Sequence, residues 1–582
     1  MRVPATPIER LPGRTTHPFC HAAACMAVAA LWTCGPLDVA LAAPPEEAAA
    51  AVVARFTVGS ADNQIGVIAE VADRAPEGPA AIAVSPQGEV FVLDTVNARV
   101  RKVLPAPSGA GFFPIPEAEQ AVDLVVTDRF YYVLDALGRQ VLKYDDEGRL
   151  ASSVPVDDPA VELTGSVTLA VLPNEDLRIR RHGADEVLLG VRTRGGPATS
   201  DLTLQTAAGL VESRFERQGD RAAQIALAGG GRAADAPADL KVESRHFLAS
   251  GELIGTDGEG RYYVLAEEMV TLGAQTLVHT VIARYTKDGK LEAVADVPVE
   301  TAVYLPNRYV VVSPKGSAYF LEPTAHEVRV LELSFVKRAT ISPEGEAQGA
   351  LGANRAAPPL ADDGFEGFVR GLYADETPPL ARGPISRDRI LENARRYLDL
   401  TWTLAPNNYE RGGIPSRCNP PGSNWRRPTR LDGKVGQPVR ALPYRWGGYE
   451  SAEGFLDKIE RGFLAGDICT CRDRALSYCI TPEATGLDCS GFVSRTLDEK
   501  YYTTSTLHKI TDPLPSLRDL KPGDILNRAG NHVRLFVGFA EGGPLAVKTL
   551  ESAVSCGGIC AATYTVSQLA KYVPLRYRYV ED

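Results

Sequence analysis

The stretch Gly486–Arg495 reads Gly-Leu-Asp-Cys-Ser-Gly-Phe-Val-Ser-Arg and contains the most informative cysteine of the chain, Cys489. An acidic residue precedes this cysteine and an apolar run follows Gly491, which predicts that the sulfur lies in the first turn of a helix. Unpaired N–H groups and the positive end of the helix dipole favour the thiolate there. Ser490 and Gly491 are small, so a carbonyl carbon can approach the sulfur. The stretch therefore predicts a catalytic nucleophile.

A nucleophile of this kind needs a base, and two histidines lie near it in the sequence, His508 and His532. His532 begins an apolar run that predicts a buried strand up to Phe539. His508 has no strand pattern behind it, so we predict that His532 is the base. Glu551, at the end of the next predicted strand, could accept a hydrogen bond from the second imidazole nitrogen and fix the tautomer. Asn531 is the alternative for this third position.

Four motifs occur in a fixed order around these residues. Tyr-Arg-Trp-Gly-Gly at 444–448 comes first, followed by Asp-Cys-Ser-Gly-Phe at 488–492, Leu-Lys-Pro-Gly-Asp at 520–524, and His532-Val533 before a strand. This ordered set resembles the NlpC/P60 family of papain-like cysteine peptidases. The resemblance implies an α+β papain-like fold for residues 385–582, with a helix beginning after Ser386.

The resemblance also implies functional roles for individual residues. Cys489 would be the nucleophile, His532 the base and Glu551 the residue that orients it. Residues predicted to contact substrate are Tyr444, Trp446, Asp488 and Ser490. The implied substrate is the peptide stem of peptidoglycan, with no cofactor and no metal. Two other functions remain open: acyl transfer or lipid-ester cleavage at the same cysteine, or a catalytically silent protein that binds the cell wall.

The chain has 582 residues and a formal net charge of -11, so we expect two or three domains. No basic patch stands out, which argues against nucleic acid as a partner. Residues 1–43 combine arginines, a short apolar run and small residues before a cleavage position, the pattern of an export signal. We therefore predict an exported protein, periplasmic or extracellular, without a membrane span.

Residues 52–335 contain a repeated unit of strands separated by glycine turns and closed by aspartate. The clearest copy is Ile82–Asp94, which resembles NHL repeats. Further copies occur at Leu124–Tyr144, Leu253–Tyr285 and Val310–Leu333, with weaker ones at Leu169–Val191 and Leu202–Leu227. Units of this kind predict a β-propeller of about six blades. Propeller faces usually bind ligands, so we expect a protein or wall ligand, although a rigid spacer is the alternative.

Residues 336–384 are rich in alanine, glycine, proline and acidic side chains, which predicts a linker. A second segment of this type, Ala405–Leu442, is inserted between the predicted helix and Tyr444. This insertion either shapes a substrate groove or has no function of its own and is fixed in place by Cys418.

Ten cysteines occur in the chain. Three lie in the predicted signal, none in the predicted propeller, and the rest are Cys418, Cys469, Cys471, Cys479, Cys489, Cys556 and Cys560. In an oxidising compartment this odd number leaves one thiol, which we assign to Cys489. Spacing favours a disulfide between Cys556 and Cys560. The alternative is a zinc site built from the paired cysteines.

Overall fold

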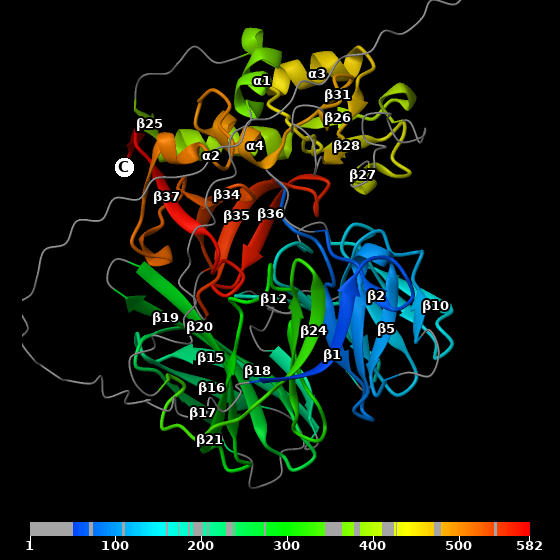
Figure 1. Cartoon of the computed structure of the whole chain (residues 1–582), viewed down its shortest axis with the longest axis vertical. Helices are drawn as coiled ribbons and strands as arrows, with labels where there is room; N and C mark the ends of the chain where they lie inside the picture. The colour runs from blue at the N-terminus through cyan, green and yellow to red at the C-terminus, as the bar shows by residue number, and fades with distance from the viewer. Residues whose placement is uncertain are drawn as a thin grey trace, which may run out of the picture. The chain divides into compact units, whose positions relative to one another are not determined.

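A computed structural model describes most of the chain after the predicted signal (Figure 1). The described residues are 50–582 except 69–73, 107–110, 159–160, 173, 184–186, 190–201, 207–208, 229–236, 238, 273–274, 344–363, 377–383, 410–423, 427, 471–478 and 541–543. Ala48–Asp582 form one compact unit, and the predicted signal lies outside the described residues. Within the described part, no helix is both long and apolar enough to cross a bilayer.

Six sheets occupy the region between Ala50 and Leu333. The first contains β1 (Ala50–Val58), β2 (Gln64–Ile65), β22 (Val310–Val312), β23 (Ala318–Pro323) and β24 (Glu327–Leu333). The second contains β3 (Ala81–Val84), β4 (Val90–Asp94), β5 (Arg99–Leu104) and β6 (Phe112–Pro114). The third contains β7 (Ala121–Val126), β8 (Tyr131–Asp135), β9 (Gln140–Tyr144) and β10 (Leu150–Pro155).

The other three sheets follow in chain order. The fourth contains β11 (Val167–Val171), β12 (Leu177–Arg181) and β13 (Val187–Leu188). The fifth contains β14 (Leu202–Thr206), β15 (Gly209–Arg217), β16 (Ala222–Ala228) and β17 (Asp239–Glu243). The sixth contains β18 (Phe247–Thr256), β19 (Tyr262–Leu272), β20 (Gln275–Tyr285) and β21 (Leu291–Val297).

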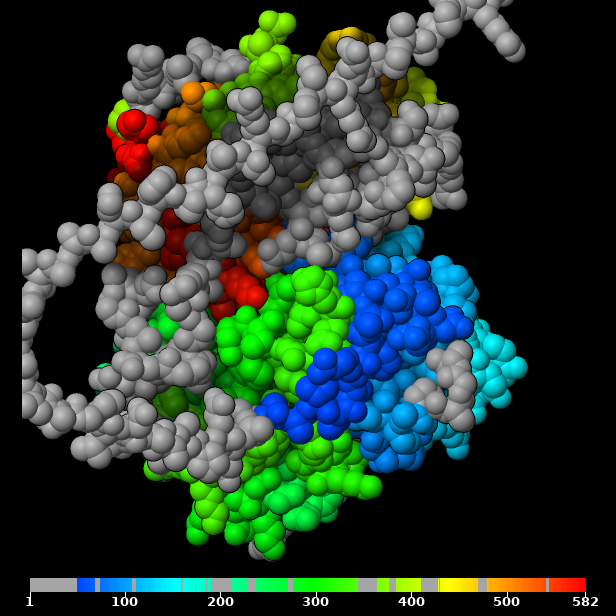
Figure 2. All heavy atoms as spheres, viewed as in Figure 1, coloured from blue at the N-terminus to red at the C-terminus, as the bar shows by residue number. Residues whose placement is uncertain are grey.

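Neighbouring sheets contact one another through one edge strand of each. These contacts run from β3 to β7 to β11 and from β14 to β18 to β22, and β22 contacts β3. The strand β1 pairs antiparallel with β24, so the sheet that holds the end of this region also holds its beginning. Figure 2 shows this blue strand beside the green ones. The predicted β-propeller is therefore confirmed, with six sheets among the described residues, and such radial repetition leaves only short edge strands.

The aspartates that close the repeats explain why the pattern recurs. Asp94 is fully buried at the end of β4, where it accepts hydrogen bonds from Arg99 Nε at 2.8 Å and Gly66 N at 2.9 Å. Asp135 holds the same place after β8 and accepts from the main-chain N–H groups of Glu119, Gln120 and Gly138. A buried carboxylate is tolerated only with such partners, so each aspartate secures a turn of its blade.

A buried histidine inside the sixth sheet should make the stability of the folded protein depend on pH. His279 donates from Nδ1 to Glu268 at 2.7 Å and from Nε2 to Asp296 at 2.9 Å. Burial alone would lower the pKa of His279, but the two carboxylates raise it to about 9 from the ordinary 6.5. Because the folded-state pKa is raised, this stabilisation should be complete below pH 6.5 and be lost as the pH rises through 9.

We expect the free energy of unfolding of the wild type to fall between pH 6.5 and pH 9, and His279→Gln to flatten that fall. Denaturant titrations at several pH values measure the free energy of unfolding of both proteins. An equally steep fall in the variant would show that other groups produce it.

The remaining sheet lies in the C-terminal part and has six strands, all paired antiparallel, in the order β32-β37-β33-β34-β35-β36. Its strands are β32 (Thr511–Pro513), β33 (Ile525–Arg528), β34 (His532–Phe539), β35 (Val547–Ala553), β36 (Gly558–Tyr564) and β37 (Val573–Tyr577). Around it lie the helices α1 (Phe365–Leu372), α2 (Arg387–Asp399), α3 (Ala452–Glu460) and α4 (Cys489–Thr496). Four two-stranded pairs complete this part: β25 (Ile385–Ser386) with β38 (Val580–Glu581), β26 (Thr401–Thr403) with β28 (Pro438–Arg440), β27 (Asn424–Arg426) with β30 (Ile468–Thr470), and β29 (Leu464–Ala465) with β31 (Ala484–Thr485).

Two helix positions bear on the sequence predictions. The cap at Ser386 is confirmed, because its hydroxyl accepts a hydrogen bond from Arg389 N where α2 begins. The helix α1 lies inside the segment predicted to be a linker. Its residues Phe365 and Val369, with Tyr373 directly after it, pack against Trp446 and its neighbours.

The propeller and the C-terminal sheet share a hydrophobic core. Ala249 and Met269 of the propeller lie in one buried cluster with Leu526, Phe536 and Val547 of the sheet. Main-chain hydrogen bonds connect the same two regions, from Ser166 N to Thr563 O at 2.7 Å and from Leu545 N to Ala249 O at 2.8 Å. The contact is therefore built from core packing and backbone hydrogen bonds.

Candidate active site

Cys489 is the first residue of α4 and is completely buried. The helix begins here because Asp488 caps it, accepting a hydrogen bond from Gly491 N to Oδ1 at 2.6 Å. A helix N-terminus stabilises a nearby negative charge, so this position favours the thiolate. The helix position predicted for Cys489 is confirmed.

Asp488 and Ser490, which we predicted to contact substrate, make internal hydrogen bonds. Besides its cap, Asp488 accepts from Ser490 Oγ at 3.1 Å and from Tyr501 OH at 2.8 Å, and both residues are fully buried. In the described structure, their contacts hold the start of α4 in place.

Tyr444 and Trp446 lie in a segment that comes before this helix in the sequence. Tyr444 donates its main-chain N–H to Gly557 O at 3.1 Å, and its side chain packs with Ile468 and Val554. The Trp446 ring lies 5.9 Å from the ring of Phe365. Both side chains are buried, so the predicted substrate-binding residues are covered in this structure.

His532 and Glu551 form a direct pair. Nε2 of His532 donates to Oε2 of Glu551 at 2.6 Å, and both side chains are 1 % exposed. The side-chain amide of Asn531, by contrast, is buried without a hydrogen-bond partner among the described residues. The structure thus places Glu551, and not Asn531, at the imidazole.

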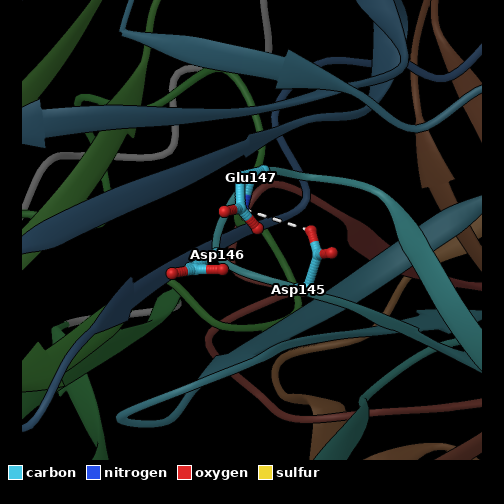
Figure 3. Close-up of side chains that lie close together, drawn as sticks. All are labelled: Asp145, Asp146 and Glu147. Carbon is cyan, nitrogen blue, oxygen red and sulfur yellow. Dashed lines mark hydrogen bonds between the residues drawn. The ribbon is translucent and has the colours of Figure 1, made fainter.

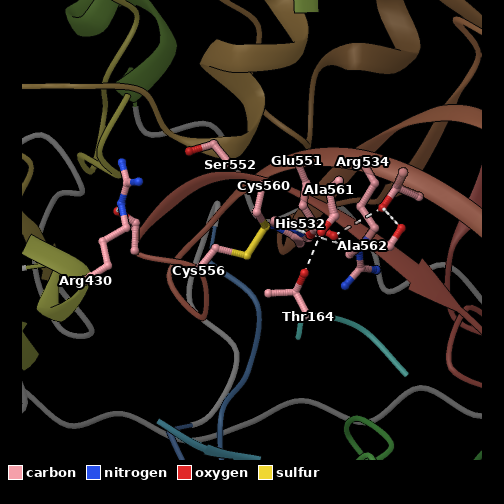
Figure 4. The surroundings of a disulfide bond; sticks show 12 residues. Thr164, Arg430, His532, Arg534, Glu551, Ser552, Cys556, Cys560, Ala561 and Ala562 are labelled. Carbon is pink, nitrogen blue, oxygen red and sulfur yellow. Dashed lines mark hydrogen bonds and ion pairs between the residues drawn. A yellow bond between two sulfur atoms is a disulfide. The ribbon is translucent and has the colours of Figure 1, made fainter. Parts of the chain in front are cut away.

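Two residues that the sequence analysis missed also bind Glu551. Arg534 Nε lies 3.0 Å from Oε2, and the Tyr564 hydroxyl donates to Oε1 at 2.7 Å. Figure 4 shows His532, Glu551 and Arg534 gathered beside the disulfide of Cys556 and Cys560 and beside Thr164 of the propeller. Strand alternation could have indicated Arg534, because residues two apart on a strand share a face.

The charges of this cluster can be assigned from its contacts. Burial alone would raise the pKa of Glu551, but the Arg534 charge and the hydrogen bonds from His532 and Tyr564 hold it at about 2. Burial lowers the pKa of His532, and Arg534 and Arg528 lower it further, against the opposing effect of Glu551. The imidazole is therefore neutral near pH 7. Since its Nε2 carries the proton donated to Glu551, Nδ1 is the basic nitrogen.

The two parts of the predicted site meet through the sheet. The helix α4 packs against β34 and β35, and Ser552 Oγ, next to Glu551, donates to Leu487 O at 2.7 Å, two residues before Cys489. Among the described residues, however, no hydrogen bond joins His532 to Cys489. The structure brings His532 and Glu551 together and places Cys489 on a helix against their strands.

Among the described residues, the observed state of the cysteines agrees with the prediction from the sequence. Cys556 and Cys560 form a disulfide, and Cys489 is outside any disulfide, as predicted. Cys479 is also disulfide-bonded, whereas Cys418 and Cys471 lie outside the described residues. The bonded pair cannot supply thiolates to zinc, which removes those two ligands from the alternative.

This pairing leads to a thiol count. We expect the mature, denatured, unreduced protein to titrate with one thiol, and peptide mapping to place it at Cys489. Full reduction of the same sample is the control, because it should release every cysteine of the mature chain. One thiol among seven cysteines means three disulfides, so three thiols in the unreduced sample would show that one of these disulfides does not form.

Acidic side chains also gather away from this site. Asp145, Asp146 and Glu147 form the turn after β9 (Figure 3), and their carboxylates are close enough to share a cation. Arg149 already pairs with Asp145 and Glu147, at 2.8 Å in each case. The turn is therefore acidic, with one guanidinium facing three carboxylates.

Comparison with known proteins finds matches among solved structures. No family model and no curated protein matches the chain. Among solved structures, a streptogramin B lyase matches with a TM-score of 0.26 and 12% identity over 48% of this chain and 97% of its own. A DUF4221 member from Bacteroides vulgatus matches with a TM-score of 0.30 and 9% identity, over 50% and 98%. A putative gluconolactonase gives a TM-score of 0.24 and 13% identity, over 51% and 99%.

None of these three is named as a cysteine peptidase. At such low scores the likeness carries no argument about activity. The assignment of a propeller therefore depends on the sheet order of this chain itself.

Proposed function

We propose that the chain is an exported cysteine hydrolase of the NlpC/P60 type, which cleaves amide bonds in peptidoglycan stem peptides. The observation that carries this proposal is the placement of Cys489 at the first residue of α4, packed against the two strands that hold the bonded His532–Glu551 pair. The substrate is taken from the motif resemblance, as is the papain-like character of the C-terminal sheet. Tyr444 belongs to the same motif set and would place its hydroxyl near the sulfur.

The proposed reaction follows from the chemistry of these groups. The Cys489 thiolate attacks the amide carbonyl, and N–H groups at the start of α4 stabilise the oxyanion. His532, neutral at the start, takes the Cys489 thiol proton at Nδ1 as the thiolate forms, and the resulting imidazolium gives that proton to the leaving amine. Neutral His532 then takes a proton from the water that attacks the acyl carbon, and the carbon–sulfur bond breaks to release the acid and the thiolate. Glu551 keeps the imidazole in the tautomer whose Nδ1 exchanges the proton.

This reaction requires a rearrangement of the described structure. Cys489, His532 and Glu551 are each at most 1 % exposed, so the substrate must displace what covers them. The described state is accordingly proposed to be a closed, latent one.

Export is supported by the cysteine chemistry. A disulfide between Cys556 and Cys560, with another at Cys479, is typical of an oxidising compartment.

The decisive experiment is mass spectrometry of soluble muropeptides after incubation of purified protein with sacculi, beside a parallel assay on a lipid ester. We expect new peptide termini with wild type and none with Cys489→Ser. Release of fatty acid without peptide cleavage would assign the cysteine to ester chemistry instead. Labelling of Cys489 by iodoacetamide near neutral pH tests for the thiolate separately.

A further inference from the structure

The propeller reaches the edge of the C-terminal sheet through one loop, Thr164–Ser166, which directly precedes β11. The strand that it meets is β36, which lies at the end of the sheet order. Ser166 N donates to Thr563 O at 2.7 Å, and Thr164 Oγ1 donates to Ala561 O. The loop thus adds to the sheet as a short extra strand and covers part of its edge.

Gly165 is the residue that allows this close approach. Its φ is +81°, and it forms an isolated parallel bridge with Thr563. A Cβ at this position would lie 2.3 Å from Thr563 O, which is too close for any side chain. Only glycine combines this backbone conformation with so short a distance between two main chains. The loop is therefore shaped to dock on β36.

The strand β36 also belongs to the surroundings of the candidate site. Cys560 of this strand lies opposite Glu551 in the register of β35 and β36. The Tyr564 hydroxyl, from the same strand, donates to Glu551 at 2.7 Å. Figure 4 shows Thr164 of the propeller beside this group. The docked loop therefore holds the strand that lies next to the His532–Glu551 pair.

The propeller covers the face of the sheet that carries this pair. Alternate residues of a regular strand share a face, so His532 and Phe536 of β34 point to the same side of the sheet. Phe536 lies in one buried cluster with Ala249 and Met269 of the propeller. The imidazole of His532 is only 1 % exposed. The docked propeller therefore closes the side from which the imidazole could be reached.

We propose that the propeller is an inhibitory lid on the C-terminal sheet, and that the loop Thr164–Ser166 is the latch that keeps it closed. Release of this loop would uncover the face that carries His532 and Glu551. The effect on catalysis rests on the proposed function, whereas the lid itself can be tested by the exposure of His532.

Chemical labelling of full-length Gly165→Ala tests the lid. The new methyl group collides with Thr563 O, so the loop must leave β36. Diethyl pyrocarbonate near neutral pH, followed by peptide mass spectrometry, measures the labelling of His532 relative to the exposed His508. We expect this ratio to rise at least about 10-fold over wild type.

Gly88→Ala is the matched control. Gly88 has a similar φ of +85°, but no atom lies within 4 Å of a Cβ placed there. The substitution therefore introduces the same backbone strain without a collision, in the turn between β3 and β4. Its labelling ratio should equal that of wild type. A rise as large as in Gly165→Ala would trace the exposure to strain in the propeller and overturn the latch.

Thr164→Val provides a second variant that introduces no strain. It removes the hydrogen bond to Ala561 O and keeps the shape of the side chain. We expect the labelling ratio to rise about 5-fold, as the loss of one hydrogen bond predicts. If the ratio in Gly165→Ala, or in Thr164→Val should the first variant not fold, equals that of wild type, the lid is overturned.

Muropeptide release by the same proteins separates this inference from the proposed function. Greater labelling with faster release supports both the lid and the hydrolase. Greater labelling with no release by any of the proteins, wild type included, keeps the lid and removes the hydrolase. Greater labelling with release at or below the wild-type rate would overturn the inhibitory role of the propeller.

Discussion

Cys489→Ala is expected to reduce the rate of peptide release from sacculi by about 10³-fold or more, because nucleophile and base act as one unit. The loss should not come from unfolding. Cys489 is a small buried side chain, and truncation to alanine removes a single sulfur atom, so the melting temperature should change little. Rates of muropeptide release, measured together with thermal unfolding, separate the two effects.

A pair of histidine variants provides the matched control for this experiment. His532→Ala should lose activity to the same extent as Cys489→Ala, since the base is then missing. His508 is exposed, and its ring bonds only to Ser505 O, at 2.8 Å, among the described contacts. His508→Ala should therefore retain activity. Full activity in His532→Ala would show that the imidazole beside Glu551 is not the base.

The sequence predicted local features well, because they depend on short spacings. The start of α4 at Cys489 follows from an aspartate cap before an apolar run, and the disulfide of Cys556 and Cys560 spans one tight turn. The propeller was predictable because its repeats carry the same buried aspartate, as at Asp94 and Asp135.

Contacts between residues far apart in the sequence were harder to predict than these local features. Arg534 and Tyr564 reach Glu551 from neighbouring strands, and only the pairing register brings these three together. The helix α1 is short and lies in a stretch whose composition indicates a linker, and its apolar face has meaning only against Trp446. The core shared by propeller and sheet depends on how two folded regions dock, which no local pattern encodes.

Glu551→Ala is expected to lower the free energy of unfolding by about 3–5 kcal/mol, because it leaves Arg534 as a buried cation without its carboxylate. Glu551 and Arg534 are 1% and 10% exposed, so solvent cannot replace the lost partner well. The pKa of Glu551 is held at about 2, below the ordinary 4.5. Its stabilising effect should therefore be present above pH 4.5 and disappear as the pH falls towards 2. Urea titrations at pH 7 and below pH 4.5 measure both effects.

Glu551→Gln separates the orientation of His532 from this charge effect. The amide oxygen can still accept from His532, but the negative charge that raises the pKa of the imidazole is gone. We expect the pKa of His532, followed by NMR, to fall further in this variant, with a loss of activity smaller than in His532→Ala. A rise in that pKa would contradict the assigned pairing.

The double variant Glu551→Gln/Arg534→Met tests whether the stability loss comes from the orphaned cation. Removing both charges leaves no unpaired ion in the interior, and buried ion pairs are often replaced by neutral side chains at little cost. The double variant should therefore be more stable than Glu551→Ala, although it carries one more substitution. If instead the loss of stability in the double variant equals the sum of the losses in Glu551→Gln and in Arg534→Met, the two side chains do not interact energetically. The stability of this sheet would then have another source.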